Sequence, residues 1–248
     1  CRLNAKQVIK NHISKGDKYT FAMQEISNYL GLKNIKKIEG YDVSHFSGDN
    51  AVASCVVFSS QGPEKKNYRL FNIPRDLSGN DIGSLEHVMQ RRIKYYADSE
   101  LKPDVILIDG GKNQLNFVKS IINKSDHHDI KVISIVKGSK RVRATETIIS
   151  EDGIIELDKY SKAFLILQEI RDESHRFAIR AQRNKKRKKI SQSELDSIKG
   201  IGEVLKKRLL TKFKSIKNIK SADLKELMTV EGINEKIAEE ILDKFKND

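Results

Sequence analysis

Two aspartates stand in apolar segments that the sequence predicts to be β-strands. Asp42 follows the segment Ile38–Tyr41, and Asp109 ends the run Val105–Ile108. An unpaired charge in such surroundings is costly, and a bound divalent cation would offset that cost. Carboxylates on neighbouring strands offer the oxygen ligands that Mg²⁺ or Mn²⁺ prefers. The pair therefore predicts a metal site, although an aspartate at a strand end can also be a turn or helix cap.

A third element lies on a predicted long helix, in the segment Arg171–Phe177. A neutral imidazole at His175 could complete the metal shell, although a lone histidine among charged residues is more often a solvated surface group. Basic side chains follow along the same helix and stand near the predicted acids. On charge alone, the candidates for gripping a DNA backbone are Lys112, Lys137, Arg176 and Arg180.

A mixed sheet with helices on its faces would position these side chains. The chain begins with helical segments up to Gly31, and an antiparallel meander of three strands follows. After it, helices alternate with buried parallel-type strands, and Ser161 caps a last long helix. The expected strands are 35–43, 51–60, 68–73, 105–108 and 131–136, with a hairpin at 148–157, and the helices are 81–97, 113–122 and one from Ser161 onward.

The last part of the chain contains an internal repeat. Ile198–Gly202 and Val230–Asn234 share the pattern apolar-x-Gly-apolar-Gly/Asn, and each lies between two predicted helices. This pattern resembles the tandem helix-hairpin-helix domain, whose outward peptide N–H groups bind phosphate without reading sequence. Asn234 replaces the second glycine and tolerates a left-handed turn. The expected DNA contacts are Lys199, Gly200, Gly202, Lys206, Gly232, Asn234 and Lys236.

Charge and composition fit a DNA-binding protein of two modules. Among 248 residues, 47 are Lys or Arg and 34 are Asp or Glu, a formal net charge of +13. Such a balance favours a polyanionic partner, although a generic basic protein would share it. Two cysteines make no disulfide framework, so a reducing cytoplasm is expected, and no apolar run is long enough for a membrane span. The expected parts are a helical lead-in (1–34), a catalytic domain (35–184), a basic linker (185–192) and the helical repeat domain (193–248).

Five motifs together resemble the C-terminal half of the UvrC family, the nuclease component of the bacterial UvrABC excinuclease. The likeness runs along nearly the whole chain. The motifs are Gly40–His45, Val52–Phe58, Tyr68–Ile73, Ile106–Lys112 and Arg171–His175.

The resemblance implies a ribonuclease-H-like endonuclease domain in which Asp42, Asp109 and His175 bind the metal. Asp81 matches a further acid that the family needs, although its neighbour here is Asn80 where relatives often have aspartate. Asn113 stands where many relatives have glycine. These departures leave the three metal-binding positions untouched.

The resemblance also implies a role in nucleotide excision repair. In the family, this half makes the incision on the 5′ side of a lesion in double-stranded DNA. A GIY-YIG domain makes the 3′ incision, and a short segment binds UvrB, which acts after UvrA. Neither part is visible in this sequence, and the chain starts at Cys1, so we expect a fragment of a longer protein.

Two other functions fit the same residues. One is a different nuclease of the ribonuclease-H fold, acting on DNA junctions or RNA–DNA hybrids. The other is a DNA-binding scaffold whose nuclease site is inactive, although the joint presence of Asp42, Asp109 and His175 argues against it.

Overall fold

The computed structural model describes residues 18–44, 51–137 and 146–246, with the side chains of 44, 137, 187–193 and 246 excluded. The chain divides into two compact units, one up to Gln182 and one from Arg183 onward. In the described part, no helix combines the length and the apolarity of a membrane span.

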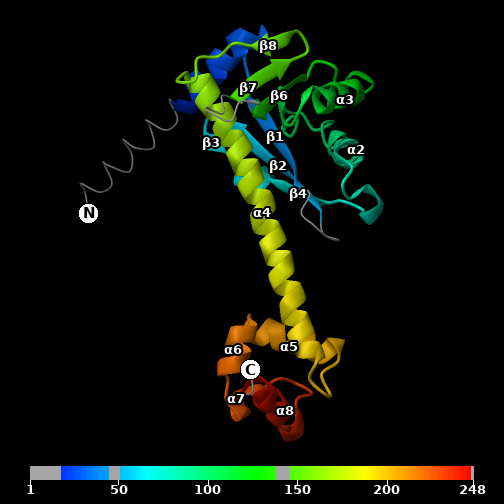
Figure 1. The fold of residues 1–248 in the computed structure, drawn as a ribbon. Helices are drawn as coiled ribbons and strands as arrows, with labels where there is room; N and C mark the ends of the chain where they lie inside the picture. The colour runs from blue at the N-terminus through cyan, green and yellow to red at the C-terminus, as the bar shows by residue number, and fades with distance from the viewer. Residues whose placement is uncertain (1–17, 45–50, 138–145, 247–248) are drawn as a thin grey trace, which may run out of the picture. The chain divides into compact units, whose positions relative to one another are not determined.

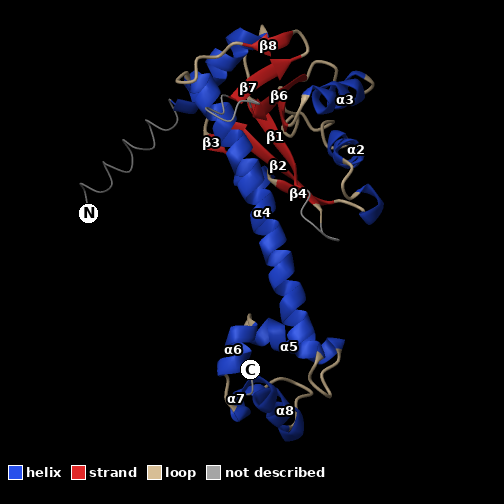
Figure 2. Ribbon diagram, viewed as in Figure 1, coloured by secondary structure: helices blue, strands red, loops and turns tan. Residues whose placement is uncertain are grey.

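The first unit is built on a mixed sheet (Figure 2). Its strands follow the order β3-β2-β1-β5-β6-β7-β8, and β4 pairs with β2. β1 is antiparallel to β2 but parallel to β5, and β5 is parallel to β6. The strands are β1 (Lys37–Ser44), β2 (Val52–Ser59), β3 (Gly62–Pro63), β4 (Arg69–Asn72), β5 (Val105–Asp109), β6 (Lys131–Lys137), β7 (Glu146–Ser150) and β8 (Gly153–Ile155).

Helices cover both faces of this sheet (Figure 1). Residues 18–30 are helical and, with α4 (Lys162–Asp196), cover one face. α2 (Asp81–Ile93) and α3 (Lys112–Asn123) cover the other, and short 3₁₀ helices η1 (Lys65–Asn67) and η2 (Arg75–Leu77) lie on either side of β4 in the chain. The mixed sheet with flanking helices that the sequence predicts is confirmed.

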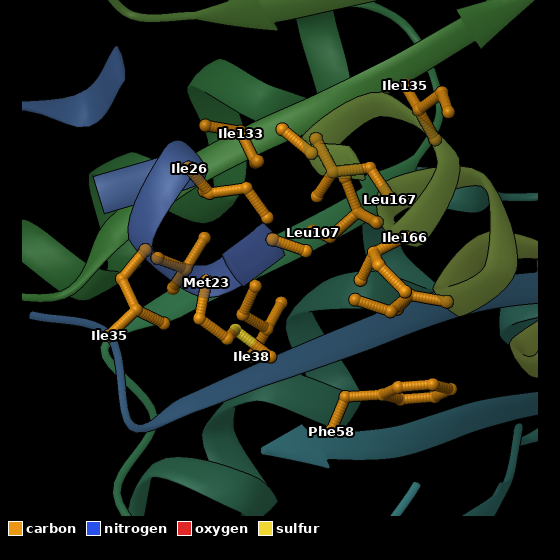
Figure 3. Close-up of a cluster of buried hydrophobic side chains, with 14 of the residues drawn as sticks. Met23, Ile26, Ile35, Ile38, Phe58, Leu107, Ile133, Ile135, Ile166 and Leu167 are labelled. Carbon is orange, nitrogen blue, oxygen red and sulfur yellow. The ribbon is translucent and has the colours of Figure 1, made fainter. Parts of the chain in front are cut away.

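Strand alternation divides the sheet into two apolar cores, because successive side chains point to opposite faces. Ile38, Leu107 and Ile133 meet Met23 and Ile26 of the first helix and Ile166 and Leu167 of α4 (Figure 3). The opposite core takes the alternate strand residues, together with side chains of α2 and α3. Both faces are therefore buried, as the continuous apolar runs of the parallel strands predict.

The predicted domain limits differ in detail from the elements. The helix 18–30 packs into the core of the first unit, so this part of the predicted lead-in belongs to the same fold. The backbone of 185–192 is helical and continues α4, so a linker at this place is a helical one. Lysine and arginine are good helix formers, which is consistent with this continuation. Residues 1–17 of the predicted lead-in lie outside the described residues.

The second unit is all helical. After the end of α4 it contains α5 (Glu203–Phe213), α6 (Ile216–Ser221), α7 (Leu224–Met228) and α8 (Glu235–Lys246). Its core is formed by equivalent residues of the two repeats, such as Ile201 and Ile233, or Leu209 and Ile241. The small helical domain expected from the repeat is confirmed.

A buried ionic network joins β1 to α2. The Arg92 guanidinium donates to Glu39 Oε1, with the Nε donor at 3.0 Å, and both side chains are almost fully buried. The hydroxyls of Tyr41 and Tyr96 donate to Glu39 Oε2 at 2.5 and 2.6 Å. Burial raises the pKa of both tyrosines well above its usual value. Burial alone would lower the pKa of Arg92, but the hydrogen bonds and charge of Glu39 raise it.

We expect Arg92→Met to lower the free energy of unfolding by about 3–5 kcal/mol, because it leaves the Glu39 carboxylate buried without a counter-charge. Adding Glu39→Gln removes that charge and retains an acceptor for the two tyrosines, so the double variant should recover about 2 kcal/mol or more. Urea unfolding followed by circular dichroism measures both. A double variant as unstable as Arg92→Met alone would contradict this explanation.

Candidate active site and DNA-binding hairpins

The two predicted strand acids lie near the carboxyl-terminal ends of the neighbouring parallel strands β1 and β5. Parallel pairing of β1 with β5 ends at Tyr41 and Ile108, so Asp42 and Asp109 each follow the last paired residue. Both belong to the alternating set that faces α4, since Ile38 and Leu107 of the same strands lie in that core. Asp42 is buried and Asp109 half-buried. Sheet register thus brings the two carboxylates together on one face.

His175 of α4 lies against the first of these acids. Its Nδ1 is 3.3 Å from Asp42 Oδ2, and the imidazole is 51% exposed while the Asp42 side chain is 9% exposed. A carboxylate at this distance orients the ring and selects its tautomer. The predicted meeting of a strand acid with the helix histidine is therefore present in the structure.

A glycine in β1 lets α4 approach the sheet closely. A Cβ added at Gly40 would lie 2.3 Å from Ile170 Cγ2, so a larger residue would force the helix away. Gly40 precedes Asp42 by two positions and therefore faces the same side of the sheet. The close approach sets the height of α4 above the site.

A serine in β2 holds α4 at the level of the histidine. Ser54 pairs with Asp42 across the β1–β2 ladder. Its hydroxyl donates to the carbonyl oxygen of Ser174 at 2.8 Å, and both serines are fully buried. Because Ser174 directly precedes His175, this hydrogen bond fixes the turn of α4 that carries the imidazole.

Asp81 occupies the first position of α2. The side chain of Asn80 caps this helix by accepting from the Gly83 N–H at 2.9 Å, a role that asparagine and aspartate fill equally well. This explains why asparagine is tolerated at position 80. Asp81 Oδ2 accepts from Gln114 Nε2 of α3 at 3.0 Å. Asp81 is thus connected to the element that follows Asp109.

The donor set suits a hard divalent cation in its chemistry. Carboxylate oxygens with one imidazole nitrogen are ligands that Mg²⁺ and Mn²⁺ accept. Within residues 18–44, 51–137 and 146–246, however, no three His, Cys, Asp or Glu side chains are grouped closely enough to hold a metal ion. The candidates to hold one remain Asp42, Asp109 and His175, of which Asp42 and His175 are in contact.

The basic residues predicted around this site lie on different elements and differ in their pairing. Lys112 is exposed at the start of α3, and Arg180 is exposed on α4. Arg176 is 65% exposed and pairs with Glu173 at 3.1 Å. Lys137 ends β6 in the backbone, but its side chain lies outside the described residues.

The two hairpins of the second unit share a backbone but differ at the helix start. Gly200 and Gly232 both have left-handed φ angles, 87° and 89°. Gly202 caps α5 without a side-chain hydrogen bond. At the equivalent place, Asn234 Oδ1 accepts from the Ile237 N–H at 3.0 Å. One amide at the start of α8 is therefore already occupied within the protein.

The structure corrects the expectation for Lys206. Its side chain is only 4% exposed and pairs with Asp196 and Glu203. The hydrogen bond to Asp196 is the largest cause that raises its pKa. The equivalent residue of the second repeat is Ala238, which is fully buried, so position 206 belongs to the core. An ammonium held in this way does not face DNA, whereas Lys199 and Lys236 are exposed.

Sequence reasoning missed three residues that support the site: Gly40, Ser54 and Gln114. A glycine inside a buried strand signals close approach of another element, so Gly40 carried a readable signal. The register of the repeat likewise shows that Lys206 is equivalent to Ala238. Nothing in the local sequence pointed to Ser54 or Gln114.

Known proteins match both units. The family model described as the UvrC RNAse H endonuclease domain matches residues 27–179, and the one described as SAM-like helix-hairpin-helix tandem matches residues 193–247.

Relatives match across both units at once. UvrABC system protein C of Legionella pneumophila (strain Paris) is 38% identical over 224 residues, covering 89% of this chain and 36% of that protein. Its namesake in Saccharophagus degradans is 36% identical over 223 residues, covering 89% and 36%. The chain thus spans little more than a third of the length of these relatives. From the family match and these identities, the chain belongs to the UvrC family, within which it carries the RNase H endonuclease domain and the tandem helix-hairpin-helix domain.

Proposed function

We propose that this chain makes the 5′ incision beside a lesion in double-stranded DNA during nucleotide excision repair, by metal-dependent hydrolysis of a phosphodiester. The observation that carries the proposal is the contact of His175 with Asp42, which together with Asp109 directly follows the last pair of the β1–β5 ladder. Membership of the UvrC family supports the substrate, with UvrB and, upstream, UvrA as partners, and a cytoplasmic location.

A divalent ion, Mg²⁺ or Mn²⁺, would supply an activated water and stabilise the charge that develops on the phosphate. The water oxygen forms the new bond to phosphorus, the bond to the 3′ oxygen breaks, and that oxygen takes up a proton. The products are a 3′-hydroxyl and a 5′-phosphate.

The residues of the chain have separate roles in this proposal. Asp42 and Asp109 would hold the ion, and the parallel pairing of β1 with β5 would keep their separation fixed. His175 is oriented by Asp42 through Nδ1, and its 51% exposure leaves the ring accessible from solvent. Asp81 is a further acid at the rim, held through Gln114. Lys112, Lys137, Arg176 and Arg180 are the proposed contacts to the DNA backbone.

The tandem hairpins would bind the phosphates of the duplex, and the first hairpin would make most of these contacts. Gly202 leaves the amides at the start of α5 without a side-chain cap, and Lys199 is exposed beside it. In the second hairpin, the positions equivalent to Lys199 and Lys207 are Glu231 and Glu239, both exposed. Gly200, Gly232 and Lys236 complete the proposed contact set.

We expect Asp42→Ala, Asp109→Asn and His175→Ala each to reduce 5′ incision at least about a hundredfold, because each removes a group that holds or orients the metal. The measurement is a nicking assay on damaged duplex with the full-length protein, UvrA, UvrB and Mg²⁺. Asp152→Ala, an exposed aspartate in the β7–β8 turn, is the matched control and should incise at the normal rate. The site assignment is wrong if Asp42→Ala and His175→Ala both leave the 5′ cut intact.

The same assay distinguishes the other nucleases of this fold. A four-way junction and an RNA–DNA hybrid are offered in parallel with the damaged duplex. The proposed function requires the damaged duplex to be cut preferentially, and preferential cutting of the junction or the hybrid would replace it.

We expect Gly202→Asn to weaken duplex binding about tenfold, because the new side chain would cap an amide that otherwise meets phosphate. The reciprocal variant Asn234→Gly should bind duplex at least as well as the unchanged chain. Both positions accept either residue, since Gly202 has φ −90°. Fluorescence anisotropy with duplex of unrelated sequence measures the affinities. Equal losses in the two variants would show that the hairpins contribute alike.

A further inference from the structure

Gln114 joins the starts of α2 and α3, which are distant in sequence. Its Nε2 donates to Asp81 Oδ2 at 3.0 Å, and its Oε1 accepts from the Gly111 N–H at 2.9 Å. Asp81 begins α2, whereas Gly111 closes the turn that leaves Asp109. α2 and α3 lie side by side on the same face of the sheet (Figure 1), and this one amide bridges their starting ends.

The two ends of the Gln114 amide cannot exchange roles. A peptide N–H can only donate, so the amide oxygen must face Gly111. The NH₂ group is then directed to Asp81, where an ionised carboxylate is the matching acceptor. The bridge therefore fixes both the place and the rotation of the Asp81 carboxylate relative to the strand end that carries Asp109.

Gly110, in the turn between Asp109 and α3, leaves space for the Gln114 side chain. A Cβ added at Gly110 would lie 1.6 Å from Gln114 Oε1 and 2.6 Å from Cδ, so no larger residue fits while the glutamine keeps this rotamer. The Gly110 N–H itself donates to the Ile135 carbonyl at 3.3 Å, which ties the turn to β6. The turn that Gln114 contacts is therefore held against β6.

A surface pocket of about 430 Å³ opens beside this bridge. Its lining includes Asp81, Gly111, Lys112 and Gln114. Asp81 is exposed at the rim, while Gln114 is half-buried behind it. The hydrogen bond from Gln114 therefore contributes to the orientation of the exposed Asp81 carboxylate.

We propose that Gln114 is a positioning residue for 5′ incision: it holds the Asp81 carboxylate in register with Asp109 across the α2–α3 junction. The inference rests on the proposed function, since it requires Asp81 to take part in the reaction. A capping role alone would need only the contact to Gly111, which a glutamate provides equally well.

The decisive variant is therefore Gln114→Glu, which keeps the acceptor for Gly111 but sets a carboxylate against Asp81. We expect the single-turnover rate of 5′ incision to fall about tenfold or more, because small displacements of a reacting group are costly. The protein concentration that gives half-maximal binding to the damaged DNA with its UvrA and UvrB partners should stay the same. The midpoint of thermal unfolding should stay within about 2 °C, since the cap is retained. Gln114→Met, which removes both hydrogen bonds at similar length, should lose the same activity and also some stability.

Two controls separate position from charge and from assembly. Asn113→Asp places the same added charge on the neighbouring exposed residue, and its rate should change by less than about threefold. The 3′ incision, which the family assigns to another domain, should proceed at the normal rate in every variant.

The outcomes also separate this inference from the proposed function. If Asp81→Asn leaves 5′ incision intact, Asp81 has no part in the reaction and both the role of Asp81 and the inference fail. If Asp81→Asn abolishes incision while Gln114→Glu cuts at the normal rate, the positioning role of Gln114 is wrong and the site assignment stands. If Gln114→Glu and Asn113→Asp lose activity equally, the effect is one of charge and the inference is overturned.

Discussion

The site depends on how closely α4 packs against β1. Gly40 leaves no side chain between the strand and Ile170, and the Ser54 hydroxyl binds the helix carbonyl just before His175. With α4 held at this distance from the sheet, the His175 imidazole contacts the Asp42 carboxylate. A bulkier strand residue would separate the two, even though neither Asp42 nor His175 had changed.

The sheet supplies the second constraint, because its register determines which side chains share a face. Asp42 and Asp109 follow paired residues of parallel strands and alternate with residues of one apolar core. On the other face, Glu39 and Arg92 fix α2, the helix that begins with Asp81. The acids proposed for the site therefore lie in β1, in β5 or at the start of a helix that buried contacts fix to β1, which is what a preorganised site would require.

Much of this could be predicted from sequence, and the parts that could not have a common cause. The buried strands have long apolar runs, and their order predicts a mixed sheet with the acids at its edge. The repeat predicts the helical hairpins. Ser54 and Gln114 act through single hydrogen bonds to residues far along the chain, Ser174 and Asp81, so no local pattern carries them. Charge alone predicts a DNA contact at Lys206, whereas the register of the repeat makes this position equivalent to the buried Ala238.

The cations of the chain divide into those that are paired within the protein and those that are exposed. The chain has a formal net charge of +13, but several of its cations are paired within the protein. Arg92 pairs with Glu39, Lys206 with Asp196 and Glu203, and Arg208 binds the carbonyl and carboxylate of Glu231. The last contact ties α5 to the second hairpin and draws an arginine toward an acidic surface. Exposed cations such as Lys199 and Lys112 remain available for the proposed contact with a phosphate backbone, so net charge suggests the class of partner while burial limits which residues could touch it.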